Sequence, residues 1–333
     1  MRNRVTIIGD GGWGTALALL LHENRRDVTV WGPFAENIES IRRERENKLY
    51  LPGVSIPDGI RWTDDPEQAV ADAEIVVLAV PSKFLRGVLA SFAGTIPAEA
   101  LLVSVVKGLD EKTGHRMTQV ADEILGREDC CALSGPSHAE EVARHIPTAV
   151  TIAARHTEDA QRLQQIFAAA RFRAYTSDDL AGVELGGALK NVIAIAVGIS
   201  DGMKFGDNTR AALITRGLVE ISRLGMKLGA RAETFAGLSG MGDLIVTCTS
   251  RHSRNRAVGE RLGRGESIED ILRETKQAVE GVWNCRAARA MARREGVEVP
   301  ITEEVYAIVH EGKSPQAAVE ALLSRGAKQE AGA

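Results

Sequence analysis

The chain has 333 residues, 44% hydrophobic and 26% charged, which is ordinary for a globular protein and long enough for two or three domains. Its formal net charge of −4 excludes a general attraction to nucleic acid or to an anionic membrane, so any bound phosphate has to be met by local positive charge. The four cysteines have no metal-type spacing, and the first residues lack the apolar region of a signal peptide. We therefore expect reduced cysteines, a cytoplasmic location and no membrane insertion.

The first half of the chain alternates short apolar runs with helical patterns. Strands are expected at Val5–Ile8, Val28–Trp31, Ile75–Val80, Leu101–Val105, Cys131–Leu133 and Ala149–Ile152. Helices are expected at Thr15–Glu23, Ala35–Arg45, Lys83–Phe92, Thr113–Leu125 and Glu158–Ala170. Strands that alternate with helices indicate βαβ units and a mostly parallel sheet. We predict an α/β domain of the Rossmann type over residues 1–178.

From about Asp178 the strand-like runs largely vanish. Helices are expected at Leu180–Gly202, Asn208–Leu228, Val258–Leu262, Ile268–Arg273, Asn284–Glu295, Ile301–Glu311 and Pro315–Ser324. This pattern predicts an all-helical domain over residues 179–326. The small and polar residues 327–333 are expected to form a flexible tail.

A glycine-rich loop follows the first predicted strand. Its residues Gly9, Gly11, Gly12, Trp13 and Gly14 lie in a GxGxxG pattern that opens a helix, which is the context of dinucleotide-binding loops. Glycines there allow a tight turn, a close approach of the backbone to a pyrophosphate, and close packing of the helix on the strand. We expect NAD or NADP to bind here, with Trp13 packing on the cofactor or in the core.

The end of the second predicted strand does not select between these two cofactors. An acidic residue about 20 residues beyond the loop usually holds the ribose hydroxyls of NAD. Here Trp31 is followed by Gly32, Pro33 and Phe34, and the first acidic residue is Glu36, with no arginine nearby. The ribose pocket is therefore predicted to be uncharged.

Several motifs in order along nearly the whole chain resemble one family, the bacterial-type NAD(P)-dependent glycerol-3-phosphate dehydrogenases. They are GDGGWGTALA from Gly9, NKLYLPG from Asn47, VPSK from Val80, VKGL from Val106, SGPSHA from Ser134, ELGGALKNVI from Glu184, GDNTRAALITRGL from Gly206, LSGMGDL from Leu238, TCTSRHSRN from Thr247 and EGV from Glu280. The resemblance implies reversible reduction of dihydroxyacetone phosphate to sn-glycerol 3-phosphate for phospholipid synthesis. It also implies a homodimer, with the helical domain serving substrate binding and dimerisation.

Two residues depart from the family pattern. Asp10 stands where the loop typically has a small residue, and because a pyrophosphate is an anion, we expect the Asp10 side chain to point away from it. Pro33 replaces a residue that is often basic or polar near the adenosine ribose.

Lys190 is the candidate catalytic residue. Reduction of a ketone leaves negative charge on the carbonyl oxygen, so the site needs a proton donor that accepts the proton in the reverse direction. Lys190 lies in a mostly apolar helical stretch, where partial desolvation would lower its pKa. From periodicity alone, a lysine that reaches solvent from a core helix is an equal alternative. The ALKN motif of the family favours the catalytic role.

Other candidates follow the predicted strands of the first domain. Lys107 lies after one strand and would orient the substrate carbonyl, while Gly135 and Ser137 lie after the next strand and would donate hydrogen bonds to substrate oxygens. A solvated lysine and a simple helix cap are the alternatives. The resemblance implies that Ala139 contacts the cofactor through its backbone.

The basic segment after residue 250 is the candidate phosphate site. Arg254 would grip the substrate phosphate, with neutral hydrogen bonds from Ser253 and Asn255. A solvated loop is the alternative. The resemblance implies that Arg254 and Lys107 also reach the cofactor.

Two acidic residues complete the candidate site. Asp243 would hold Lys190 or a substrate hydroxyl, or simply cap a helix, and the resemblance implies that Glu280 lies on the cofactor side. His138 is interpreted as a packing residue. No histidine or cysteine cluster has metal-ligand spacing, so no metal is expected.

Two other functional classes remain open from these residues. One is another two-domain dehydrogenase, of the 6-phosphogluconate or 3-hydroxyacid type. The second is a nucleotide-binding regulator that is not an enzyme, which would need the glycine loop but not Lys107, Lys190 and Arg254.

Overall fold

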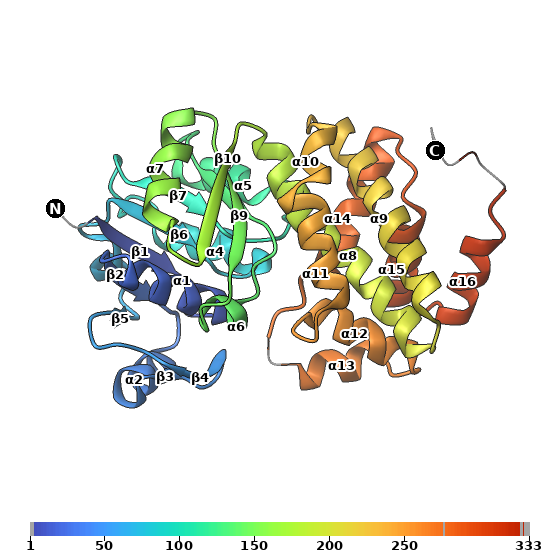
Figure 1. Ribbon diagram of the computed structural model, residues 1–333, viewed down its shortest axis with the longest axis horizontal. Coiled ribbons are helices and arrows are strands. Elements are labelled where there is room, and N and C mark those ends of the chain that lie inside the picture. Colours follow the sequence, from blue (N-terminus) through green and yellow to red (C-terminus); the bar gives the residue numbers. More distant parts are fainter. Residues whose placement is uncertain (1–2, 276, 327–328, 330–333) are drawn as a thin grey trace.

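The computed structural model describes residues 3–275, 277–326 and 329. A region built around a sheet and a region built from helices lie side by side (Figure 1). The predicted tail, residues 327–333, lies outside the described residues except for Gln329.

The main sheet has eight strands in the order β10-β9-β8-β7-β6-β1-β2-β5. The strands are β1 (Arg4–Ile8), β2 (Asp27–Trp31), β5 (Arg61–Thr63), β6 (Ile75–Leu78), β7 (Leu101–Ser104), β8 (Cys131–Ser134), β9 (Thr148–Ala153) and β10 (Phe172–Ser177). All neighbouring pairs are parallel except β8 and β9, which are antiparallel. The carboxyl ends of β1, β6, β7 and β8 therefore meet at one edge of the sheet.

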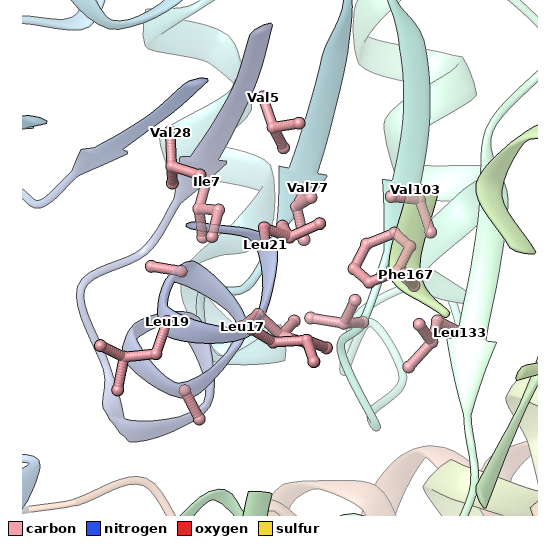
Figure 2. Packing of buried hydrophobic residues seen from close by; sticks show 14 of the residues in the cluster. Val5, Ile7, Leu17, Leu19, Leu21, Val28, Val77, Val103, Leu133 and Phe167 are labelled. Atoms are coloured by element: carbon pink, nitrogen blue, oxygen red, sulfur yellow. The ribbon is translucent and has the colours of Figure 1, made fainter. Parts of the chain in front are cut away.

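Helices cover this sheet because its strands are apolar on both faces. They are α1 (Gly12–Glu23), α2 (Ala35–Glu44), α3 (Pro66–Val70), α4 (Ser82–Ser91), α5 (Met117–Leu125), α6 (Ala139–Val142) and α7 (Thr157–Phe167), and the antiparallel pair β3 (Glu46–Asn47) and β4 (Leu51–Ser55) follows α2. Figure 2 shows Leu17 and Leu21 of α1 in one cluster with Ile7, Val77 and Phe167. This packing fixes α1, and with it the glycine loop, against the centre of the sheet.

The second region consists of α8 (Leu180–Gly202), α9 (Asp207–Lys227), α10 (Ala232–Ala236), the π-helical segment η1 (Leu238–Gly242), α11 (Asp243–Thr249), α12 (Arg254–Gly263), α13 (Ile268–Glu274), α14 (Glu280–Glu295), α15 (Pro300–Glu311) and α16 (Pro315–Leu323). Helix α8 is long and apolar enough to cross a membrane, but 89% of its most apolar window is buried inside the protein. It is the central helix of this region: α9, α10, α11, α12, α14 and α15 pack against it, while α13 packs on α12 and α16 packs on α15.

Helices α8 and α12 approach each other unusually closely. A Cβ on Gly198 of α8 would collide with the carbonyl oxygen of Arg256, and a Cβ on Gly259 of α12 would collide with that of Ile195. Because hydrogen is the only side chain that fits at these contacts, the glycines set the distance between the two helices. This contact brings the residues after Lys190 next to the residues after Arg254.

The predicted fold class is confirmed, with a mostly parallel sheet followed by helices. The sheet ends at Ser177 and α8 begins at Leu180, while the division between residues 178 and 179 stays a prediction. The sequence pattern did not predict the edge strands β5 and β10, the pair β3–β4, or the segment from α10 to α11. These elements are short and carry no clear apolar period.

Candidate active site

The glycine loop has the geometry of a phosphate cradle. Gly9 has a φ of +126°, and a Cβ on it would lie 2.7 Å from the carbonyl carbon of Ala79 at the end of β6. A Cβ on Gly14 would collide with the carbonyl oxygen of Gly9, whereas a Cβ on Gly11 would meet nothing within 4 Å. The loop is therefore open on the Gly11 side, next to the N–H groups at the start of α1, and these residues fit a dinucleotide pyrophosphate.

The loop after β8 lies beside this cradle. A Cβ on Gly12 would lie 3.8 Å from the Cβ of Ala139, the first residue of α6. Ala139 therefore lies beside the glycine loop, and its contact with the cofactor stays a prediction. Trp13 is partly buried and packs against the apolar core of the sheet region, which leaves both interpretations of this side chain open.

Lys107, Gly135 and Ser137 come together at the ends of β7 and β8. The Lys107 Nζ atom donates a 2.7 Å hydrogen bond to the carbonyl oxygen of Gly135 and lies 3.2 Å from the Ser137 Oγ atom. The Ser137 hydroxyl donates to the same carbonyl oxygen over 2.9 Å. The three residues form one polar group at the edge of the sheet that faces the helical region.

Asp243 links this group to Lys190. The Lys190 Nζ atom is buried, hydrogen-bonds to Oδ1 of Asp243, and donates a 2.7 Å bond to Thr247 Oγ1. The Lys107 Nζ atom lies 2.9 Å from Oδ2 of the same carboxylate. Asp243 is the first residue of α11 and Thr247 lies one turn later, so both face α8. Two lysines from two domains thus share one buried carboxylate.

The pKa values of Lys190 and Asp243 are both lowered, for different reasons. Burial lowers the pKa of Lys190 to about 7, helped by the charge of Lys107 and opposed by Asp243. Burial alone would raise the pKa of Asp243, but the two lysines outweigh it and lower that pKa below its ordinary value. Near neutral pH, Lys190 is therefore poised between its charged and neutral forms beside an ionised Asp243.

A chain of asparagines joins the two regions behind this cluster. The Asn191 amide donates to the carbonyl oxygen of Lys107 over 2.9 Å, and its own oxygen accepts a 3.0 Å bond from Asn255. The Asn255 oxygen accepts from the backbone N–H of Gly281 over 2.8 Å. The amide of Asn255 is therefore engaged within the protein, and Ser253 caps α12 by accepting a bond from the Arg256 N–H. The structure gives both residues a structural role beside the substrate role expected for them.

Arg254, at the start of α12, and Glu280, at the start of α14, lie within electrostatic range of each other. The exposed Arg254 side chain donates a 2.9 Å bond to the carbonyl oxygen of Ala278, and its guanidinium lies within the electrostatic range of Glu280 and Glu140. Glu280 accepts bonds from the backbone N–H and the hydroxyl of Ser82, at the start of α4. Burial raises the pKa of Glu280, and these bonds with Ser82 oppose that effect. Glu280 thus ties α14 to the end of β6.

His138 belongs to the same surroundings. It precedes α6, and its ring lies 5.9 Å from that of His252. Burial, together with the charges of Lys190 and Lys107, lowers the pKa of His138 to about 4. The imidazole is therefore neutral near pH 7, and its buried Nε2 atom has no partner among the described residues.

Thr247, Asn191 and Ser82 also belong to this site and were not predicted from the sequence. Thr247 lies four residues after Asp243, and helical spacing in that segment would have been the signal. Asn191 directly follows Lys190, but its partners at Lys107 and Asn255 lie far away in the sequence. Within the described residues, no group of three histidine, cysteine, aspartate or glutamate side chains is arranged to hold a metal ion.

Comparison with known proteins covers nearly the whole chain. Residues 4–160 match the family model of the NAD-dependent glycerol-3-phosphate dehydrogenase N-terminus, and residues 179–320 match the model of its C-terminus. The chain is 49% identical over 333 residues to glycerol-3-phosphate dehydrogenase [NAD(P)+] of Pelotomaculum thermopropionicum, covering 99% of this chain and 95% of that protein. It is 49% identical to the protein of the same name from Geobacillus thermodenitrificans, covering 98% of this chain and 96% of that protein.

A solved structure agrees with these sequence matches. The crystal structure of glycerol-3-phosphate dehydrogenase from Coxiella burnetii superposes with a TM-score of 0.94 at 38% identity. The superposition covers 97% of this chain and 99% of that chain.

Proposed function

The chain belongs to the NAD-dependent glycerol-3-phosphate dehydrogenase family and has its NAD(P)-dependent oxidoreductase activity, and on that premise we propose which residues carry the reaction. The substrate pair is dihydroxyacetone phosphate and sn-glycerol 3-phosphate. The nicotinamide cofactor, when bound, supplies or accepts the hydride at carbon 2. Gly9, Gly11, Gly12 and Gly14 would hold its pyrophosphate.

Lys190 exchanges the proton at the substrate oxygen. A general acid works best when its pKa is near the working pH, and burial brings the pKa of Lys190 to about 7. Asp243 and Thr247 hold the Lys190 amine in place through hydrogen bonds. The buried cluster of Lys190, Asp243 and Lys107 is the observation that carries this proposal.

Lys107 and Arg254 supply the positive charge that an anionic substrate needs. Lys107, with Ser137 and Gly135, lies at the end of the sheet and would orient the carbonyl end of the substrate. Arg254, with Ser253 and Asn255 beside it at the start of α12, would anchor the phosphate. Ala139 and Glu280 would lie along the cofactor.

The test is oxidation of NADH with dihydroxyacetone phosphate, measured for the chain and for Lys190→Ala. We expect kcat to fall by about 10²–10⁴-fold in the variant, because this is the usual contribution of a general acid. NADH should still bind to Lys190→Ala with nearly unchanged affinity. Near-normal turnover would exclude the role of Lys190. Faster turnover of 6-phosphogluconate or a 3-hydroxyacid would favour the rival dehydrogenase classes.

A homodimer is part of the same proposal, as are a cytoplasmic location and a role in phospholipid synthesis. The surface of α9 supports the dimer, because only 5 of its 21 residues are buried in the single chain. Apolar residues of α9, α15 and α16 line a groove, and Leu323 beside it is 80% exposed. Sedimentation at micromolar concentration should give twice the mass of one chain. A monomer at that concentration would contradict this part.

A further inference from the structure

The end of β2 lacks the side chain that usually recognises the 2′-position of the adenosine ribose. In dinucleotide-binding sheets an acidic residue at this position accepts a hydrogen bond from the 2′-hydroxyl of NAD, or an arginine nearby accommodates the 2′-phosphate of NADP. Here β2 ends at Trp31 and Gly32 follows, without a side chain. By sequence alone the ribose pocket carries no charge.

The carboxylate of Asp10 reaches this position from the glycine loop. A Cβ on Gly32 would lie 2.6 Å from Oδ2 of Asp10, so the carboxylate fills the space that a larger residue at 32 would take. The Asn37 side chain at the start of α2 donates a 2.7 Å bond to the same oxygen. Asp10 turns away from the pyrophosphate cradle, as expected, and this turn places its charge at the end of β2.

The surroundings hold Asp10 in place. The Asp10 carbonyl oxygen accepts a 2.7 Å bond from the buried Asn47 side chain, and that amide also bonds Thr15 in α1 over 2.8 Å. The Asp10 residue is only 5% exposed. Its position is therefore set by the loop, by α1 and by the β3–β4 pair together.

No cation of the described chain neutralises this carboxylate. Burial raises the pKa of Asp10, and hydrogen bonds from Asn37 and from its own backbone oppose that rise, with no lysine or arginine contributing. Arg42, on the same helix as Asn37, bonds the carbonyl oxygen of Trp62, and Lys48 pairs with Glu44. A 2′-phosphate at the end of β2 would therefore lie beside the Asp10 carboxylate, whose negative charge no lysine or arginine compensates.

We propose that Asp10 is the residue that selects the cofactor, by accepting a hydrogen bond from the 2′-hydroxyl of NADH and repelling the 2′-phosphate of NADPH. The proposal rests on the proposed function only in taking a nicotinamide dinucleotide as the ligand. It assigns to the glycine loop a task that usually belongs to the second strand. It also explains why a glycine at position 32 accompanies an aspartate at position 10, since a side chain at 32 would collide with the carboxylate.

The test is equilibrium binding, measured by titration calorimetry with NADH and with NADPH at low salt and without substrate. We expect the protein to bind NADH at least about ten-fold more tightly than NADPH, as one uncompensated charge pair implies. In Asp10→Asn and Asp10→Ala this ratio should fall at least about ten-fold, mainly because NADPH binds more tightly. The control is Glu36→Gln, which removes an exposed carboxylate from the first turn of α2 and should leave the ratio unchanged.

Two results would overturn the proposal. One is equal affinity of the wild-type protein for NADPH and NADH. This measurement does not depend on the folding of any variant. The other is a ratio that stays within two-fold in both Asp10 variants, or that moves equally in Glu36→Gln. A protein that binds NADH selectively but does not reduce dihydroxyacetone phosphate would refute the proposed function and leave this inference standing. A protein that reduces dihydroxyacetone phosphate but binds NADH and NADPH with equal affinity would refute this inference and leave the proposed function standing.

Discussion

Replacing Asp243 by asparagine should change the pH at which the enzyme works. Asp243 is 1% exposed and lies between the amines of Lys190 and Lys107, with Lys107 Nζ 2.9 Å from its Oδ2 atom. Asparagine keeps the shape of the side chain and removes the negative charge. The charged form of Lys190 then loses its main electrostatic support, while Lys107 continues to disfavour it.

The size of the effect follows from the contact distances. An opposite charge this close shifts a pKa by about 1–3 units, so the pKa of Lys190 should fall from about 7 to between about 6 and 4. Reduction of the ketone requires the protonated amine. At pH 7 the protonated fraction would fall from about one half to about a tenth or less. A weaker base is also a stronger acid, which offsets part of this loss.

The assay is the pH dependence of kcat/KM for dihydroxyacetone phosphate, because this parameter reports the pKa values of the free enzyme. In the wild type, activity should decline as the pH rises through about 7. In Asp243→Asn the decline should begin roughly 1–3 pH units lower. Asp207→Asn is the control, since its side chain on α9 is 92% exposed. A variant that is slower but keeps the wild-type inflection, with an unchanged thermal midpoint, would refute the electrostatic reasoning.

Arg254→Ala should raise the KM for dihydroxyacetone phosphate by about 10–100-fold, since a hydrogen bond to a charged group contributes about 1.5–3 kcal/mol. If both KM and kcat/KM are unchanged, Arg254 does not bind the substrate phosphate. Gly259→Ala should lower the free energy of unfolding in urea by about 1–3 kcal/mol, because the added Cβ collides with the Ile195 carbonyl oxygen. Gly87→Ala in α4 is its matched control: a Cβ there meets nothing within 4 Å, so helix propensity should make it neutral or stabilising, and equal losses in both variants would contradict the close-packing argument.

The sequence predicted the parts of the fold in which apolar residues form a continuous run or recur at a regular spacing. The buried strands β1, β6 and β7 are continuous apolar runs, and α8 is an apolar helix of 23 residues. The segment from η1 to α11 was not predicted, because the two glycines within Leu238–Gly242, together with Gly237 before them, are typical of a loop. Tertiary packing makes it helical: a Cβ on Gly240 would collide with the backbone of Phe235, and one on Gly186 of α8 would lie 2.5 Å from the Ser239 carbonyl oxygen.

In the site too, the sequence motifs identified the residues but not the contacts that these residues make. The VKGL, SGPSHA and ALKN segments pointed to Lys107, Ser137 and Lys190, and the structure brings these residues to one place. No motif shows that a side-chain amide is already engaged, as that of Asn255 is with Asn191 and Gly281. Likewise, the charge of Asp10 was visible in the sequence, but its destination beside Gly32 depends on where β1 and β2 lie in the sheet.

The proposed role of Lys190 depends on both regions of the chain. The sheet region contributes Lys107 after β7, and the helical region contributes Lys190 and Asp243, so among the described residues neither region alone brings these two lysines to the carboxylate. Asn191 adds a hydrogen bond from α8 to the backbone of Lys107, which ties α8 to the segment that carries this lysine. The buried amine of Lys190 would be costly without the carboxylate, and the partly buried Lys107 lies beside the same carboxylate, so the pKa of Lys190 depends on how the two regions are placed. A change that separates the domains should therefore alter proton exchange before it disturbs either hydrophobic core.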